Sequence, residues 1–147
     1  MLWIEAVSPD HPDARALLDQ AAAVLQAITG SDGRASFQDW TDDARHVFLL
    51  ARDGAAPVGC GGVRLLEPGV GEIKRMYAAR PGEGIGAAVL AALETEAHAR
   101  GYGALWCETR RVNEGAVRFY ERHGYTVREN YGRYVGNEAA VCFEKPL

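Results

Sequence analysis

The sequence is poor in lysine: Lys74 and Lys145 are the only two among its 147 residues. Arginine supplies the rest of the positive charge, and the formal net charge is -4. A chain with no basic run lacks the charge pattern that binds nucleic acid or an anionic membrane, so we expect neither as a partner. The arginine bias has two explanations of equal weight: a guanidinium fork that recognises phosphate or carboxylate, and the codon usage of a GC-rich genome.

Long apolar runs and paired cysteines are missing too. No segment approaches about 18 continuous apolar residues, and no basic stretch followed by an apolar run opens the chain, so we expect a cytoplasmic protein. Cys60, Cys107 and Cys142 are odd in number, far apart and not clustered with histidine. This spacing predicts neither a disulfide nor a metal site, and a buried thiol is the expected role of each.

The composition that is present is that of a folded globular protein. Apolar residues make up 48% of the chain and charged residues 24%. The length lies near the commonest domain size, and such a composition supports one hydrophobic core. We therefore expect residues 1–147 to form a single domain.

The first half of the chain predicts a strand, a helix and a hairpin. Residues 2–7 form the strand, and Asp10 caps the alanine-rich helix that follows. An Asp-Gly dipeptide at 53–54, favoured in tight turns, separates two further strands at 47–51 and 58–66. The second of these contains three glycines, which predict a bulge or the close approach of another backbone.

The second half predicts alternating strands and helices around a glycine-rich turn. In order, the expected elements are a strand over 72–78, the turn over 80–86, a helix closed by Gly101, a strand over 104–109, a helix capped by Asn113 and ended by Gly124, and a final hairpin within 125–144.

The glycine-rich turn is suited to an anion. Where a strand enters a helix through glycines, the backbone amides and the helix dipole can hold a pyrophosphate. A nucleotide-hydrolysing phosphate loop would need Gly-Lys followed by Ser or Thr, but Ala87 follows Gly86. A dinucleotide fold would place the turn after its first strand, whereas this turn lies mid-chain after an antiparallel hairpin.

Three stretches of the sequence carry a specific resemblance. They are residues 72–102, residues 113–125 (NEGAVRFYERHGY) and the ending AVCFEK at 140–145. In combination they resemble the GNAT acetyltransferase family. The resemblance implies an α/β (α+β) fold with a mixed, mostly antiparallel twisted sheet of about six to seven strands, flanked by about four helices. The sheet would splay between the strands at 72–78 and 104–109.

The resemblance also implies acetyl-CoA as co-substrate, bound in the splay, with no metal. Backbone groups of the strand before the turn, the turn itself and one helix cap would contact the coenzyme. The implied residues are Met76, Tyr77, Ala78, Gly82, Glu83, Gly84, Ile85, Gly86, Ala87 and Asn113. Asn113 has an alternative role of similar weight as a helix N-cap.

The turn departs from the family pattern in two ways. Pro81 occupies the place of the usual Arg or Gln, with Arg80 one position early, and the loop is shorter than usual. Glu83 adds a negative charge where phosphate would lie. These departures keep a catalytically silent acyl-CoA-binding module open as an alternative.

Acetyl transfer to an amine needs a base and an acid. Glu72 is the expected base by resemblance, with a structural ion pair to an arginine such as Arg75 as the equal alternative and Glu108 in reserve. Tyr120 is the expected acid, because a phenol can protonate a departing thiolate. Cys107 as a nucleophile has little support without a neighbouring histidine.

The acceptor should meet the polar segment 31–40 and the loop between the last strands. The candidate substrate contacts are Arg34, Phe37, Glu108, Arg133 and Tyr134. We predict direct acetyl transfer to a primary amine of a small molecule by a monomer or homodimer. Acetylation of protein N-termini or lysines and transfer of a longer acyl group remain alternatives.

Overall fold

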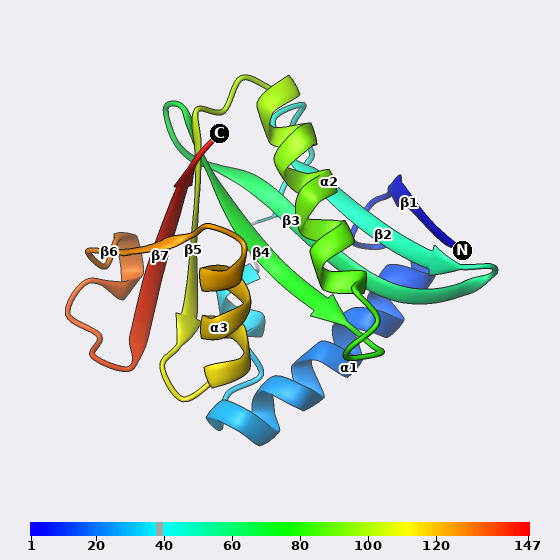
Figure 1. Ribbon diagram of the computed structural model, residues 1–147, viewed down its shortest axis with the longest axis horizontal. Coiled ribbons are helices and arrows are strands. Elements are labelled where there is room, and N and C mark those ends of the chain that lie inside the picture. Colours follow the sequence, from blue (N-terminus) through cyan, green and yellow to red (C-terminus); the bar gives the residue numbers. More distant parts are fainter. Residues whose placement is uncertain (38–39) are drawn as a thin grey trace.

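The computed structural model describes residues 1–37 and 40–147, which form one sheet flanked by helices (Figure 1). The strands are β1 (Leu2–Ala6), β2 (Val47–Asp53), β3 (Ala56–Glu67), β4 (Val70–Ala78), β5 (Ala104–Arg110), β6 (Thr126–Arg128) and β7 (Ala140–Pro146). The helices are α1 (Pro12–Thr29), α2 (Ile85–Ala99) and α3 (Glu114–Arg122), with short 3-10 helices η1 (Arg34–Phe37) and η2 (Gly132–Tyr134).

The seven strands follow the order β1-β2-β3-β4-β5-β7-β6. Every neighbouring pair is antiparallel except β4 and β5, which run parallel. This arrangement confirms the expected mixed, mostly antiparallel sheet. The described residues form three α-helices where about four are expected, because the segment after α1 makes only one 3-10 turn.

The sheet splays between β4 and β5. Backbone pairs join Val70–Glu72 to Ala104–Trp106, and no further pair joins the two strands in the described part of the chain. Between Lys74 and Tyr77, β4 carries one more residue than the facing part of β3, and Arg75 there has a left-handed φ of 59°. A bulge of this kind bends its strand, so β4 turns away from β5 toward its C-terminal end (Figure 1).

The helices cover both faces of the sheet. Neighbouring residues of β2 point to opposite sides, so Phe48 packs in one core cluster with Leu17 of α1 while Leu49 packs in another. The second cluster also contains Leu93 of α2 and Tyr120 of α3. Thus α1 lies on one face, and α2 and α3 lie together on the other.

Two glycines of β3 let α2 and β4 come close, as the sequence predicts. A Cβ built on Gly59 would lie 2.5 Å from Cγ2 of Ile85, the first residue of α2. A Cβ on Gly61 would lie 2.5 Å from the Met76 sulfur. Real Cβ atoms do not approach so closely, so a side chain at Gly59 would displace Ile85, and one at Gly61 would push the flexible Met76 side chain aside.

One predicted helix cap is wrong. His11, not Asp10, caps α1, since its Nδ1 accepts from the Asp13 amide at 3.1 Å. The Asp10 amide instead donates to the Ser8 hydroxyl at 3.1 Å, in the turn that precedes the helix. With Pro12 at the first helical position, the cap must be the residue directly before it.

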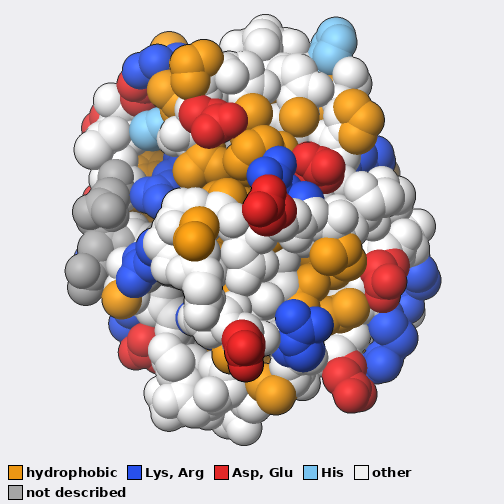
Figure 2. Space-filling model, turned by 90° about the vertical axis from the view of Figure 1, so that its left-hand side faces the viewer, with side chains coloured by type: hydrophobic (Ala, Val, Ile, Leu, Met, Phe, Trp, Pro, Cys, Tyr) orange, Lys and Arg blue, Asp and Glu red, His pale blue; other side chains and the backbone are white. Residues whose placement is uncertain are grey.

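The free edge at β6 is short and charged. β6 has three residues, and Arg128 there pairs with Glu144 of β7 at 3.0 Å and lies over the Trp106 ring. Figure 2 faces this end of the sheet and shows hydrophobic side chains in small groups among charged ones. Such an edge discourages pairing with another strand. Within residues 1–37 and 40–147, no helix is both long and apolar enough to cross a membrane.

Candidate active site

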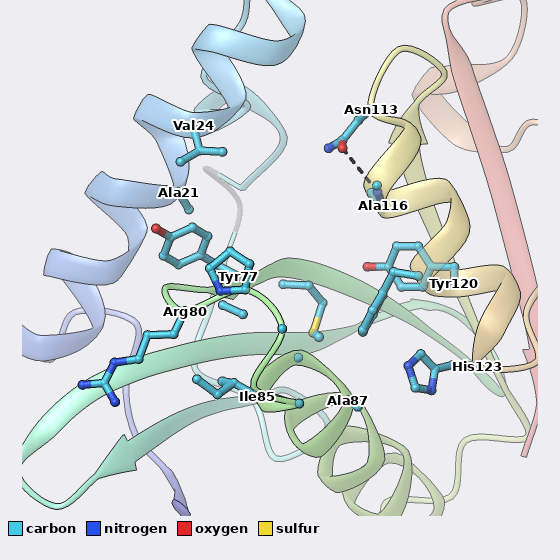
Figure 3. Close-up of a pocket in the computed structure, with 18 of the residues that line it drawn as sticks. Ala21, Val24, Tyr77, Arg80, Ile85, Ala87, Asn113, Ala116, Tyr120 and His123 are labelled. Atoms are coloured by element: carbon cyan, nitrogen blue, oxygen red, sulfur yellow. Dashed lines mark hydrogen bonds between the residues drawn. The ribbon is translucent and has the colours of Figure 1, made fainter.

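Two adjoining cavities occupy the splay. The larger, of about 580 Å³, lies between α1, the end of β4, the glycine-rich turn and α3 (Figure 3). The smaller, of about 250 Å³, extends along β4 and β5 to η2. Six residues line both, namely Leu25, Arg75, Met76, Asn113, Ala116 and Tyr120. A ligand in one cavity can therefore touch a ligand in the other.

The glycine-rich turn offers backbone donors to the larger cavity. Gly82 and Gly84 have φ values of 81° and 76°, a conformation that glycine adopts without strain. The amides of residues 85–87 have no intrahelical carbonyl to bond, and no side chain caps them. These donors at the N-terminus of α2 suit an anionic group such as a pyrophosphate.

Most coenzyme contacts expected from the sequence lie around this cavity, and one does not. Met76, Tyr77 and Ala78 of β4 line it, together with Asn113 and the turn except Glu83. Glu83 is exposed and outside the lining. Its charge therefore does not occupy the place that the amides offer to an anion.

The other departure from the family pattern is Arg80, which lies one position before the usual place of Arg or Gln. Arg80 lines the larger cavity, but its guanidinium points away from it (Figure 3) and pairs with Asp53 at 2.8 Å. The backbone amides, rather than this guanidinium, thus form the anion site at the turn.

Sequence reasoning missed the walls that α1 and α3 supply. Ala21 and Val24 of α1 lie across the larger cavity from Tyr120 and His123 (Figure 3). Ile28 of α1 and Phe119 of α3 also line it. The helical period of α1 marks an apolar face, but no local signal says that part of it lines a ligand cavity rather than core. The cavity consequently combines an apolar wall with an anion site, which suits a long ligand with a polar end.

Tyr120 lies where the two cavities meet. Its side chain is 7% exposed, and its hydroxyl points toward the cavity from α3 (Figure 3). Burial and the neighbouring Cys107 thiol raise the pKa of Tyr120 well above its usual value. The phenol therefore stays protonated at neutral pH and can donate its proton.

Glu72 lines neither cavity. Its carboxylate is 2% exposed and accepts from Arg64 Nε at 3.1 Å and from the Tyr131 hydroxyl at 2.7 Å. Lys74 Nζ lies 3.5 Å from the same carboxylate. The arginine partner is Arg64 rather than Arg75, and the arrangement is that of a buried structural ion pair.

Glu108 is the carboxylate that does line the smaller cavity. Burial raises its pKa, while the guanidinium of Arg110, 2.7 Å away, and the ammonium of Lys74 oppose the shift. Its side chain is largely buried and faces the same cavity as Tyr120. A carboxylate with a raised pKa next to a proton donor is an arrangement that supports acid–base chemistry.

Of the remaining candidate substrate contacts, two line the smaller cavity and two line neither cavity. Arg133 and Tyr134 line the smaller cavity. Arg34 lines neither cavity and pairs with Asp19 and Asp32, and Phe37 packs beneath the Arg75 guanidinium. Residues 38 and 39 of the candidate acceptor segment lie outside the described residues.

Asn113 lies where both of its expected roles require it, at the N-terminus of α3 and at the cavity wall. Its Oδ1 accepts from the Ala116 amide at 3.3 Å, which caps α3, and the residue lines both cavities (Figure 3). Among the described residues, no group of three or more His, Cys, Asp or Glu side chains could hold a metal ion.

The comparisons with known proteins identify the family. The family model described as Acetyltransferase (GNAT) family matches residues 8–125. The chain belongs to the GNAT acetyltransferase family. This GNAT protein is therefore an acetyl-CoA-dependent acyltransferase, as the resemblance in its sequence implies.

Individual relatives agree with this membership. The GNAT chain is 38% identical over 104 residues to an IAA acetyltransferase of Azospirillum brasilense, covering 68% of this chain and 67% of the relative. A Klebsiella pneumoniae structure assigned provisionally as an acyl-CoA N-acyltransferase superposes with a TM-score of 0.87 at 29% identity, over 100% of this chain and 98% of the other. The PaiA N-acetyltransferase of Thermoplasma acidophilum, in complex with coenzyme A, has a TM-score of 0.74 at 17% identity over 100% and 99% of the two chains.

Proposed function

We propose that this protein transfers an acetyl group from acetyl-CoA to a primary amine of a small molecule by direct attack. The observation that carries the proposal is the meeting of two cavities at Tyr120. One cavity has the backbone donors for a pyrophosphate, and the other has a carboxylate that can accept a proton from an amine. We further propose that residues 1–147 work as one domain, because the family match spans most of the chain. A location in the cytoplasm remains part of the proposal and rests on the absence of a long apolar run in the sequence.

The larger cavity is the proposed coenzyme site. Its size and its apolar walls suit the arm of acetyl-CoA, and the amides at 85–87 suit the pyrophosphate. The fold neighbour from Thermoplasma acidophilum holds coenzyme A, which supports the assignment. When bound, acetyl-CoA supplies a thioester carbon that an unprotonated amine can attack.

Glu108 is the proposed base. An alkyl ammonium must lose a proton before it can attack, and Glu108 lines the smaller cavity with a raised pKa. Sequence reasoning placed Glu72 in this role, with Glu108 in reserve. Because the Glu72 carboxylate already accepts from Arg64 and Tyr131, we propose that it positions its neighbours instead.

Tyr120 is the proposed acid. Its hydroxyl lies at the junction of the cavities, where the leaving thiolate would form. A thiol has a pKa near 8.5 and a phenol one near 10, so proton transfer from Tyr120 to the thiolate is uphill by about 1.5 units or more. Tyr120 therefore gives its proton as the carbon–sulfur bond breaks, and the phenolate that forms then takes a proton from solvent. Direct attack by the amine needs no covalent enzyme intermediate. Burial raises the pKa of the Cys107 thiol and keeps it protonated, which disfavours Cys107 as a nucleophile.

Calorimetry with acetyl-CoA, followed by an assay of thiol release with a panel of small amines, tests the proposal. Binding together with amine-dependent release supports it. Binding without release from any amine, peptide or protein acceptor contradicts it and supports the silent acyl-CoA-binding module. Release with a peptide N-terminus or lysine but with no small amine supports the protein acetyltransferase instead.

A further inference from the structure

The smaller cavity has an excess of positive charge. Four cationic side chains line it, those of Lys74, Arg75, Arg110 and Arg133, against the single carboxylate of Glu108. Arg110 pairs with that carboxylate at 2.7 Å. Lys74 pairs with Glu72 at 3.5 Å, so Arg75 and Arg133 are the cations of this cavity without a carboxylate partner in the described part of the chain.

Of the two cations without a carboxylate partner, Arg75 is partly buried and its Nε has no hydrogen-bond partner among the described residues, and Arg133 is exposed. Arg133 Nη1 donates to the backbone carbonyl of Ala35 at 3.3 Å, and within the described ranges no carboxylate lies within 4.0 Å of the Arg133 guanidinium. An arginine at a cavity wall with only a carbonyl partner keeps most of its donors free. Its planar fork suits a carboxylate that binds through both oxygens.

Tyr134 adds a neutral donor beside Arg133. Its hydroxyl accepts from Lys74 Nζ at 3.0 Å, so the hydroxyl proton remains for another acceptor. The Tyr134 side chain lies against both Lys74 and Arg110, at 5.5 and 6.0 Å from its ring centre. Tyr134 is thus held in a cationic surrounding and faces the same cavity.

The size of the cavity limits the ligand. Its volume of about 250 Å³ lies below the range of about 300–1,000 Å³ in which pockets for drug-sized ligands fall. Tyr120, which lines both cavities, marks the coenzyme side, and Arg133 and Tyr134 lie on η2. Burial raises the pKa of Tyr120 and of Tyr134, and Glu108 is close enough to both tyrosines to raise each pKa further. A molecule with an amine at one end and an anion at the other matches this distribution of charge.

We propose that the acceptor is a small amine that carries a carboxylate, bound by Arg133 and the Tyr134 hydroxyl while its amine faces Glu108. This inference rests on the proposed acetyl transfer and names the class of its acceptor. An amine without an acidic group would leave Arg133, which is exposed, hydrogen-bonded to water and the buried Tyr134 hydroxyl without an acceptor, so it would lack the charged hydrogen bonds that a carboxylate makes. The same argument favours an amino acid over its neutral amide.

The test compares each of a panel of amino acids with its own carboxamide in the thiol-release assay. We expect kcat/KM to be about 10- to 100-fold higher for the carboxylate form, the scale of one or two charged hydrogen bonds. We expect Arg133→Gln to remove this preference by raising KM, with kcat nearly unchanged, and Arg133→Lys to restore part of it. Arg118→Gln is the matched control, because Arg118 is exposed on α3 and lines neither cavity.

The outcomes separate this inference from the proposed function. Equal rates for carboxylates and carboxamides, or an Arg133→Gln effect of the same size on both, would overturn the carboxylate site while leaving acetyl transfer intact. If no amine is acetylated, the proposed function fails, and calorimetry with the coenzyme-loaded protein still decides the inference. Amino-acid binding that Arg133→Gln weakens supports it, and the absence of binding overturns it. Melting temperatures of the variants check that each is folded.

Discussion

Single side chains decide which carboxylate and which phenol can take part in the reaction. Tyr120 and Tyr125 both lie near the end of α3 with edge-to-face rings, yet only Tyr120 lines the cavities. Tyr125 donates to Glu94 at 2.7 Å instead. The two tyrosines thus form a natural pair of test and control.

Replacing Tyr120 with Phe should lower kcat by about 10- to 1,000-fold, the usual scale of a lost general acid. Binding of acetyl-CoA should stay within a few-fold, because the ring remains against the cavity. Steady-state kinetics and calorimetry measure the two quantities. Tyr125→Phe should keep turnover, since its hydroxyl faces Glu94. Unchanged kcat in folded Tyr120→Phe would remove Tyr120 from the mechanism.

The pH dependence of the rate should identify the base. Glu108 must be ionised to accept a proton, and its pKa is raised by burial. We therefore expect kcat/KM to fall as the pH drops through a value above the ordinary range of a glutamate. Glu108→Gln should lower the rate by about 10- to 1,000-fold and remove this acid limb, whereas Glu121→Gln, on the exposed side of α3, should leave it in place.

Glu72 should behave differently from Glu108. Replacing Glu72 with Gln leaves the buried charges of Lys74 and Arg64 without their carboxylate, which costs on the order of 3 kcal/mol of unfolding free energy. Urea unfolding measures this loss. A Glu72→Gln variant that keeps full stability but has lost the acid limb would restore the role that sequence reasoning gave to Glu72.

For single residues, the sequence predicted which side chains are near the site better than it predicted their contacts. Tyr120, Glu108, Arg133 and Tyr134 were candidates and all line a cavity. Glu72 was a candidate too, but its contacts come from Arg64 and Tyr131, distant in the chain. No local pattern reports such partners, because they depend on how strands and loops pack.

Close packing between strands and helices creates the two cavities. Gly59 lets Ile85, and with it the first turn of α2, rest directly on β3. That turn carries the amides that face the larger cavity. The position of the anion site consequently depends on a missing side chain in a strand that does not line it.

Gly59→Ala should therefore lower both stability and coenzyme affinity. The added methyl would meet Ile85 at 2.5 Å and the Tyr77 carbonyl at 3.3 Å, an overpacking that typically costs about 1–3 kcal/mol. Urea unfolding and acetyl-CoA calorimetry provide the measurements. In Gly103→Ala, the control, the new methyl lies 3.8 Å from its nearest contact, so a change within about 0.5 kcal/mol is expected. Equal effects in the two variants would contradict this account.

Most elements were predictable because their signals are local. Alternating apolar residues, the Asp-Gly turn and the glycine-rich junction gave strands and helices close to those observed. The parallel pairing of β4 with β5 and the bulge at Arg75 were not visible in the residues alone. The expected splay came from resemblance to a family, since no property of a single strand specifies its neighbour.

The whole molecule should respond to its co-substrate as one stability unit. A ligand that binds only the folded state stabilises it by about 2.7 kcal/mol at one hundred times its dissociation constant. For a chain of this length that corresponds to a rise of about 5–10 °C in melting temperature. Thermal unfolding with and without acetyl-CoA measures it, with free pantothenate as the control that lacks the pyrophosphate. No shift at saturating acetyl-CoA would contradict a coenzyme site in the larger cavity.

The parting of β4 from β5 also divides the sheet into two wings. β1 to β4 form one wing, and β5, β7 and β6 form the other, joined in the sheet by a parallel ladder of three residue pairs. Beyond that ladder, the edge of β4 that faces β5 has no pairing strand in the described part of the chain. The arm of acetyl-CoA, if bound along this edge, would lie beside β4 like an added strand and would hold the two parts of the sheet together. Amide hydrogen exchange along residues 76–78 would then slow when acetyl-CoA binds and recover when the product leaves.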